Sequence, residues 1–174
     1  LVLSIALTMI GGAAGLRAGS FNPWIFLLTV LGVTLAHVSV NLFNEYSDWR
    51  TGIDRNTIKT PFSGGSGILQ DGLLKPGHVR AAAFATLGAA FFIGLGLAHR
   101  SGWPVLALMT AGGLSAIFYT EHLTRRTLGE AASGVTLGSF VVLGSYFVQT
   151  GAFDAAIIWV SIPPGILTAL LLFL

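Results

Sequence analysis

The 174-residue sequence contains no cysteine, and only 9% of its residues are charged. Without cysteine the chain can form no disulfide and offers no thiolate to a metal ion. The charged fraction lies far below the roughly 25% that is usual in soluble domains. The formal net charge of +2 is too small to indicate a nucleic-acid partner, and we expect none.

The remainder of the composition is apolar, with 53% hydrophobic residues and a mean hydropathy of +0.80. Apolar runs of about 20 residues, which is the length that crosses a bilayer, predict six spans. These cover roughly residues 1–16, 23–49, 79–98, 103–120, 128–149 and 155–174. We therefore predict an all-α, polytopic transmembrane helix bundle. Neither end of the chain has a polar flank, so we expect a fragment of a longer protein.

Basic residues are distributed unequally between the two sides of the predicted membrane. One side carries Arg50, Arg55, Lys59, Lys75, Arg80, Arg125 and Arg126, and the other carries Arg17 and Arg100. The positive-inside rule makes the more basic side cytoplasmic. All acidic residues except Asp154 share that side. Because acids contribute little to orientation, their gathering there indicates a functional site.

The second predicted span carries a polar stripe that ends in carboxylates. At 100° per residue, six of its polar side chains fall within an arc of about 100°. They are Thr34, His37, Asn41, Asn44, Glu45 and Asp48. Acids in membrane spans usually face a protein interior and take part in function. A solvated helix end is the alternative, but it does not explain an alignment over four turns. For His37 an interhelical hydrogen bond is the more ordinary role.

The end of this stripe has the chemistry of a magnesium site. Asn44 and Asp48 lie one turn apart on one face, and Gly52 permits a sharp exit from the helix. That exit allows Asp54 to fold back toward them. Magnesium takes oxygen ligands, commonly one or two carboxylates together with phosphate oxygens and waters. A diphosphate completes such a site, and neighbouring lysines and arginines would hold its remaining charge.

The segment Asn44-Glu-Tyr-Ser-Asp48 resembles the first aspartate-rich motif of the UbiA superfamily of intramembrane prenyltransferases, Asn-x-x-x-Asp-x-x-x-Asp. Gly52 departs from the third position. The 1,4-dihydroxy-2-naphthoate (menaquinone-pathway) branch instead carries Asn-Asp-x-x-Asp-x-x-x-Gly-x-Asp. Gly52 and Asp54 fit that pattern, and Glu45 is a conservative difference. Similar downstream segments are Thr60-Pro-Phe-Ser-Gly-Gly-Ser-Gly67, Gly72-Leu-Leu-Lys-Pro76, Tyr119-Thr120, Leu128-Gly-Glu130 and Tyr146-Phe-Val-Gln-Thr-Gly151.

The resemblance implies a bundle of about nine transmembrane helices around a cavity that opens near the cytoplasmic face. Residues 1–174 would then form a partial prenyltransferase domain that ends before a second aspartate-rich motif, and alone would be inactive. The implied reaction is Mg²⁺-dependent transfer of a polyprenyl group from a prenyl diphosphate to an aromatic acceptor of the quinone-precursor type. We expect an integral protein of a prokaryotic inner or cell membrane, surrounded by lipid, with its active site toward the cytoplasm.

The resemblance also implies roles for individual residues. Asn44, Asp48 and Asp54 would be catalytic and would hold the metal ion, with Glu45 as a further ligand. The candidate substrate-binding residues are Asn41, Lys59, Tyr119, Arg125 and Arg126. Lys59 and the two arginines would contact diphosphate oxygens, and Tyr119 would stabilise a carbocation or place the acceptor. Arg125 and Arg126 are equally consistent with positive-inside anchors, and Tyr119 with an interfacial aromatic residue.

Other functions remain open at this point. A cation-coupled transporter also uses intramembrane carboxylates and broken helices, but here the acids lie at the membrane edge and no internal repeat is visible. A CDP-alcohol phosphotransferase would carry Asp-Gly-x-x-Ala-Arg, which is not found. A non-catalytic lipid-binding member of the same superfamily also fits. Elsewhere, Gly134 and Gly138 predict a close helix crossing.

Overall fold

The computed structural model describes residues 1–52, 66–118 and 134–171. Its helices are α1 (Val2–Arg17), α2 (Pro23–Thr51), α3 (Pro76–Ser101), α4 (Pro104–Phe118), the π-helix η3 (Gly134–Ser139), α6 (Phe140–Thr150) and α7 (Ala155–Leu171). Within these ranges there is no strand, and η3 runs directly into α6. Over the residues that the structure describes, the predicted all-α class is confirmed, and a helix occupies each of the six positions predicted as spans.

Local sequence signals set the two ends of α2. The Asn22 side-chain oxygen accepts hydrogen bonds from the backbone N–H groups of Trp24 at 3.0 Å and Ile25 at 3.1 Å, and Pro23 occupies the first turn. At the other end Gly52 adopts φ +70° and its N–H bonds to the Asp48 carbonyl at 2.9 Å. Gly52 therefore ends the helix in the left-handed conformation that glycine permits.

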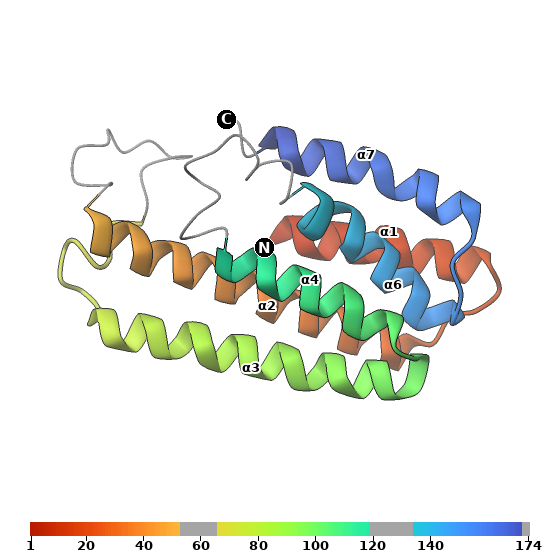
Figure 1. Cartoon of the computed structure of the whole chain (residues 1–174), viewed down its shortest axis with the longest axis horizontal. Coiled ribbons are helices and arrows are strands. Elements are labelled where there is room, and N and C mark those ends of the chain that lie inside the picture. The colour runs from red at the N-terminus through yellow and green to blue at the C-terminus, as the bar shows by residue number, and fades with distance from the viewer. Residues whose placement is uncertain (53–65, 119–133, 172–174) are drawn as a thin grey trace.

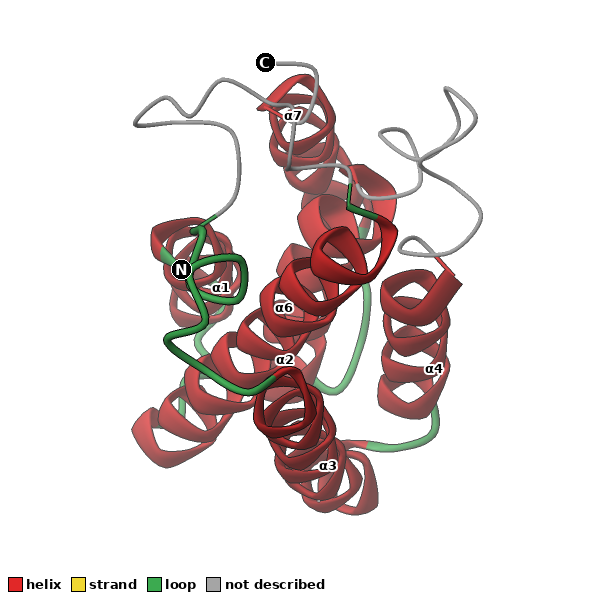
Figure 2. Cartoon of the chain, turned by 90° about the vertical axis from the view of Figure 1, so that its left-hand side faces the viewer, coloured by secondary structure: helices red, strands yellow, loops and turns green. Residues whose placement is uncertain are grey.

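The helices run roughly along the long axis of the molecule (Figure 1). α2 and α3 pack against each other along most of their length, α1 packs on α6, and α7 packs on η3. Viewed along the axis, α6 lies between α1 and α4, with α7 and α3 on opposite sides (Figure 2). α2 and α3 extend further than the other helices toward the end that carries the acidic residues (Figure 1).

Exposed tryptophans mark one end of this bundle. Trp24 at the start of α2, Trp103 between α3 and α4, and Trp159 in α7 are each at least 72% exposed. Tryptophan is enriched at membrane–water interfaces. From Trp24, about 20 residues at 1.5 Å rise cover the hydrocarbon thickness of about 30 Å and lead to Asn44. In a bilayer that meets these tryptophans at one boundary, this length would bring the acidic end of α2 to the opposite boundary. α2 and α3 are both long and apolar enough to cross a bilayer.

Asp154 joins α6 to α7 at the tryptophan end. The Tyr146 hydroxyl donates a 2.6 Å hydrogen bond to Asp154 Oδ2, and the Ile157 N–H donates to Oδ1 at 2.8 Å. These two bonds hold the pKa of the Asp154 carboxyl below its ordinary value, and the bond from Tyr146 has the larger effect. The same acid thus caps α7 and ties it to α6.

Gly134 and Gly138 allow η3 to approach α7 closely. A Cβ at Gly134 would lie 2.6 Å from the carbonyl oxygen of Gly165, and a Cβ at Gly138 would lie 2.6 Å from the Cα of Gly165. Both of these contacts are with backbone atoms, which cannot move away by a side-chain rotation. The close helix crossing predicted from this glycine pair is confirmed.

Replacing Gly138 with alanine is expected to destabilise the protein by about 1–3 kcal/mol, because the added methyl group forces η3 and α7 apart. The measurement is the fraction of detergent-solubilised protein that stays monodisperse after heating. Gly96→Ala is the matched control, since a Cβ at Gly96 meets no atom within 4 Å and alanine favours the helix. Equal heat resistance of Gly138→Ala and the wild type would contradict the crossing described here.

Candidate functional site

The predicted site residues that the structure describes lie on the last turns of α2. Asn44, Glu45 and Asp48 are half-buried, and Asn41 is exposed. Asn44 and Asp48 are four residues apart and share a helix face. The remaining predicted residues, Asp54, Lys59, Tyr119, Arg125 and Arg126, lie outside the described residues.

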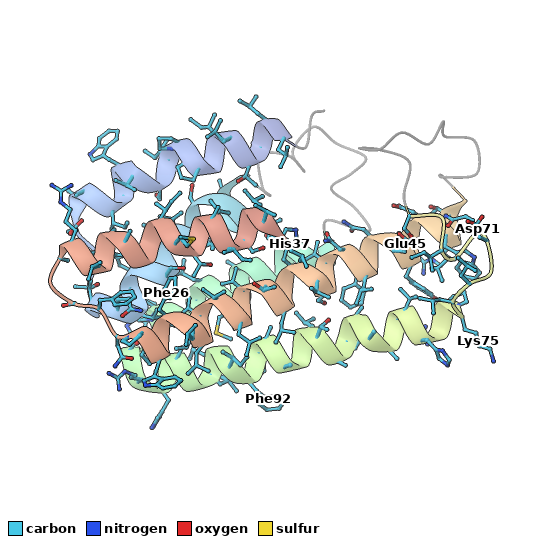
Figure 3. The ribbon with its side chains drawn as sticks, turned by 180° about the vertical axis from the view of Figure 1, so that it is seen from behind. Phe26, His37, Glu45, Asp71, Lys75 and Phe92 are labelled. Carbon is cyan, nitrogen blue, oxygen red and sulfur yellow. The ribbon has the colours of Figure 1, made fainter. Side chains whose placement is uncertain are left out.

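Glu45 holds the segment that follows the acidic end of α2. The Ser66 hydroxyl donates to Glu45 Oε1 at 2.7 Å, and the Ser66 N–H donates to Oε2 at 3.4 Å. The segment then turns back through a hydrogen bond from the Asp71 N–H to the Gly67 carbonyl at 2.8 Å, with Leu69 buried. Figure 3 shows Glu45, Asp71 and Lys75 together at this end. Glu45 therefore ties segment 66–75 to the helix that carries Asn44 and Asp48.

The opposite side of α2 is fixed by α3. The Ser39 hydroxyl donates to the Ala83 carbonyl at 2.8 Å, and the rings of Phe43 and Phe84 meet edge to face at 5.0 Å. Nearer the acidic end, the Arg80 guanidinium lies 5.7 Å from the centre of the Tyr46 ring, a cation–π contact. These contacts keep α2 from rotating, so the face that carries Asn44 and Asp48 stays directed away from α3.

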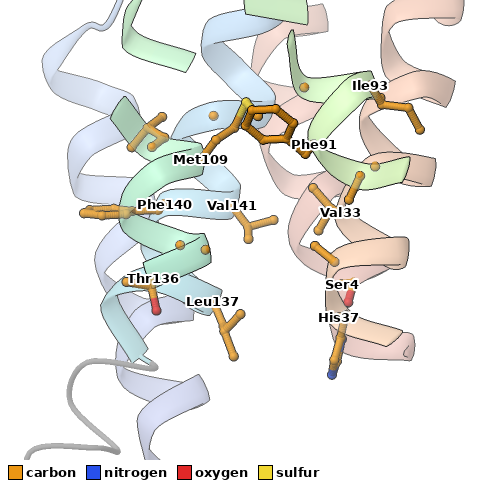
Figure 4. Close-up of a pocket in the computed structure, with 18 of the residues that line it drawn as sticks. Ser4, Val33, His37, Phe91, Ile93, Met109, Thr136, Leu137, Phe140 and Val141 are labelled. Carbon is orange, nitrogen blue, oxygen red and sulfur yellow. The ribbon is translucent and has the colours of Figure 1, made fainter. Parts of the chain in front are cut away.

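That same face of α2 continues into an apolar cavity of about 580 Å³. Its walls come from α1, α2, α3, α4, η3 and α6 and include Val33, Phe91, Met109, Leu137 and Phe140 (Figure 4). On α2 the lining runs from Thr29 to Val40, one turn before Asn44. The volume lies within the range of about 300–1,000 Å³ that is common for small-molecule sites. The apolar lining on α2 thus ends one turn before a carboxamide and two turns before a carboxylate.

His37 and Ser4 form a polar pair in the wall of this cavity. The Ser4 hydroxyl is hydrogen-bonded to His37 Nδ1, which joins α1 to α2. The interhelical hydrogen bond expected for His37 is confirmed. Because Ser4 is 4% exposed, the bond also satisfies a hydroxyl that has little access to water.

The described part of the site offers few ligands for a metal ion. No group of three or more His, Asp or Glu side chains gathers within the described ranges. Asn44 and Asp48 supply one carboxamide and one carboxylate on a shared face. This oxygen set suits a magnesium ion that keeps waters and phosphate oxygens as its other ligands, and it does not suit zinc.

Two hydrogen-bonding partners in this site, Ser66 and Ser4, could not be identified from the sequence. Ser66 lies in a glycine-rich stretch 21 residues after Glu45, and Ser4 lies 33 residues before His37. No spacing rule links residues so far apart, because both contacts depend on how segments pack after each helix has formed. Amphipathic analysis of α2 could place Glu45 and His37, but it could not name what they contact.

The model of the UbiA prenyltransferase family matches residues 4–174. The chain belongs to this family. Its members are integral membrane proteins. No solved structure matches the chain.

Several named relatives are similar over most of the chain. A 1,4-dihydroxy-2-naphthoate octaprenyltransferase of Bacillus subtilis is 32% identical over 82% of this chain and 46% of the relative. One of the same name from Haemophilus influenzae is 29% identical over 99% of the chain and 58% of the relative. A protoheme IX farnesyltransferase of Clavibacter sepedonicus is 35% identical over 78% of the chain and 42% of the relative. The chain therefore spans about half the length of the curated relatives it matches.

Glu45→Ala is expected to loosen segment 66–73, because the substitution removes both hydrogen bonds from Ser66. At about 1 kcal/mol for the lost bonds, backbone amide exchange there should accelerate about fivefold by hydrogen–deuterium exchange mass spectrometry. Asp71→Ala is the control, since Asp71 is an exposed acid in the same segment. Unchanged exchange in Glu45→Ala would show that Glu45 does not hold this segment.

Proposed function

We propose that the protein transfers a polyprenyl group from a prenyl diphosphate to an aromatic acceptor inside the membrane. One observation carries this proposal: the α2 lining of an apolar cavity ends at Val40, one turn before Asn44 and two turns before Asp48. A prenyl diphosphate has the same two parts, a long hydrocarbon chain and a compact anion. Membership of the prenyltransferase family supports this assignment.

Asn44 and Asp48 are the described residues that would hold Mg²⁺, together with Asp54, which lies outside the described ranges. A bound magnesium ion supplies charge neutralisation and a template for the departing diphosphate. Glu45 has a different role in this proposal, since its carboxylate already accepts two hydrogen bonds from Ser66. It places segment 66–75 beside the diphosphate, and it contributes to the metal ion only as a supporting charge.

The cavity walls contribute by excluding water. Once the bond between the prenyl carbon and the diphosphate oxygen breaks, the allylic cation must meet the aromatic ring before it meets water. Aliphatic and aromatic side chains such as Val33, Phe91 and Leu137 provide that dry surrounding. The aromatic carbon then forms the new bond and loses its proton. Lys59, Arg125 and Arg126 are proposed to hold diphosphate oxygens, with Asn41 and Tyr119 near the substrates.

The identity of the aromatic acceptor and the orientation of the protein in the membrane are also part of this proposal. Relatives named as 1,4-dihydroxy-2-naphthoate octaprenyltransferases favour a bicyclic quinone precursor as the acceptor. Arg50, Lys75 and Arg80 lie at the acidic end of the bundle, whereas Arg17 and Arg100 end α1 and α3 at the tryptophan end. By the positive-inside rule this distribution favours a cytoplasmic position for Asn44 and Asp48.

Asp48→Ala is expected to lower turnover by at least about 10²-fold, on the scale of losing one preorganised charge-stabilising group. The assay is transfer of a radiolabelled prenyl group to 1,4-dihydroxy-2-naphthoate by the longest natural form of the protein, with and without Mg²⁺. Asp71→Ala is the charge-matched control. Near-normal turnover by Asp48→Ala would remove Asp48 from the site, and donor binding without transfer by the wild type would favour a lipid-binding role.

A further inference from the structure

The polar pair in the cavity wall has no role in holding the prenyl chain or the diphosphate. His37 and Ser4 face an otherwise mainly apolar chamber, and Figure 4 shows the His37 ring beside Ser4 at the end of the drawn cavity. A prenyl chain has no polar atom that could pair with an imidazole. An apolar side chain would line the cavity for such a chain equally well, so the pair points to a ligand that carries oxygen.

The hydrogen bond between the two side chains fixes where the ring proton lies. The Ser4 hydroxyl is buried, and among the described residues its only partner is His37 Nδ1. A buried hydroxyl donates its proton to an available acceptor, so Nδ1 accepts and the ring proton resides on Nε2. Nε2 has no hydrogen-bond partner in the part of the chain that the structure describes. It is therefore a hydrogen-bond donor available to a ligand.

The depth of His37 identifies which reactant it meets. It precedes Asn44 by two helical turns on the same face, so it lies about 10 Å deeper in the bundle. A diphosphate held at Asn44 and Asp48 does not reach it. An aromatic acceptor whose reacting carbon lies near the diphosphate end can direct a ring oxygen inward to this depth.

We propose that His37, held by Ser4, donates a hydrogen bond from Nε2 to the hydroxyl oxygen beside the carboxylate of the aromatic acceptor and so selects and orients that substrate. The inference rests on the proposed function for the identity of the acceptor. It adds a specificity-determining residue outside the aspartate-rich motif. A site built to pair with a substrate hydroxyl discriminates strongly against analogues that lack it, because its own donor is then left unpaired.

The test measures acceptor binding separately from transfer. The probe is tritiated 1-hydroxy-2-naphthoate, which is stable in air, added to the purified longest natural form of the protein. His37→Phe keeps an aromatic ring but removes the donor, and it should weaken binding about five- to tenfold. His37→Gln should retain most of the affinity, because its side-chain amide can place an N–H near the position of Nε2.

Controls separate recognition from packing. Ser101→Ala also removes an interhelical hydrogen bond, from α3 to the Val148 carbonyl of α6, but Ser101 does not line the cavity. It should lower thermal stability as much as His37→Phe while leaving acceptor binding unchanged. In turnover assays, His37→Phe should raise the acceptor KM and leave the donor KM within about twofold. 2-Naphthoate, which lacks the hydroxyl, should bind the wild type and His37→Phe equally.

The outcomes distinguish this inference from the proposed function. Weaker binding by His37→Phe than by His37→Gln and Ser101→Ala supports the inference, whether or not the preparation transfers a prenyl group. Absence of transfer despite normal acceptor binding counts against the proposed function alone. Equal binding by the wild type and His37→Phe, or no binding by the wild type, overturns the inference.

Discussion

One face of α2 has to meet water at the membrane boundary and an apolar cavity inside the bundle, and the rest of the structure follows from that requirement. The face of α2 that carries Asn44 and Asp48 meets the membrane boundary, and one turn deeper the same face lines an apolar cavity. Placing carboxylates deeper would cost several kcal/mol each, whereas moving the cavity outward would flood it with water. The helix length from Trp24 to Asn44 matches the thickness of the hydrocarbon layer, so one continuous helix can meet both conditions.

The other helices hold this face in position. α3 contacts the far side of α2 through Ser39 and Tyr46, and segment 66–75 returns to Glu45. η3 approaches α7 at Gly138, which leaves the side of η3 that bears Leu137 to line the cavity. A π-helix at this point is in keeping with the frequent occurrence of such turns at functional sites.

Sequence patterns predicted the spans, the polar stripe of α2 and the glycine crossing, because each depends on residues within one or two turns. The start of α3 at Pro76, slightly before the predicted residue 79, reflects a proline that is tolerated in a first helical turn. A cavity was expected only from the family resemblance, and its lining residues could not be predicted, since its walls come from helices far apart in the chain. The contacts of Glu45 with Ser66 and of His37 with Ser4 likewise depend on tertiary packing. The metal-ligand and substrate roles assigned to Asn44, Asp48 and Asp54 stay predictions.

The most direct measurement of the central claim is an experimental structure of the longest natural form of the protein with Mg²⁺ and a non-hydrolysable prenyl thiodiphosphate. We predict that the diphosphate analogue lies against Asn44 and Asp48 and that its hydrocarbon chain runs into the cavity past Val33 and Phe91. A diphosphate bound at the tryptophan end, near Arg17 and Arg100, would contradict this account. A hydrocarbon chain of the analogue that lies on the lipid-facing surface, outside the cavity, would also contradict this account.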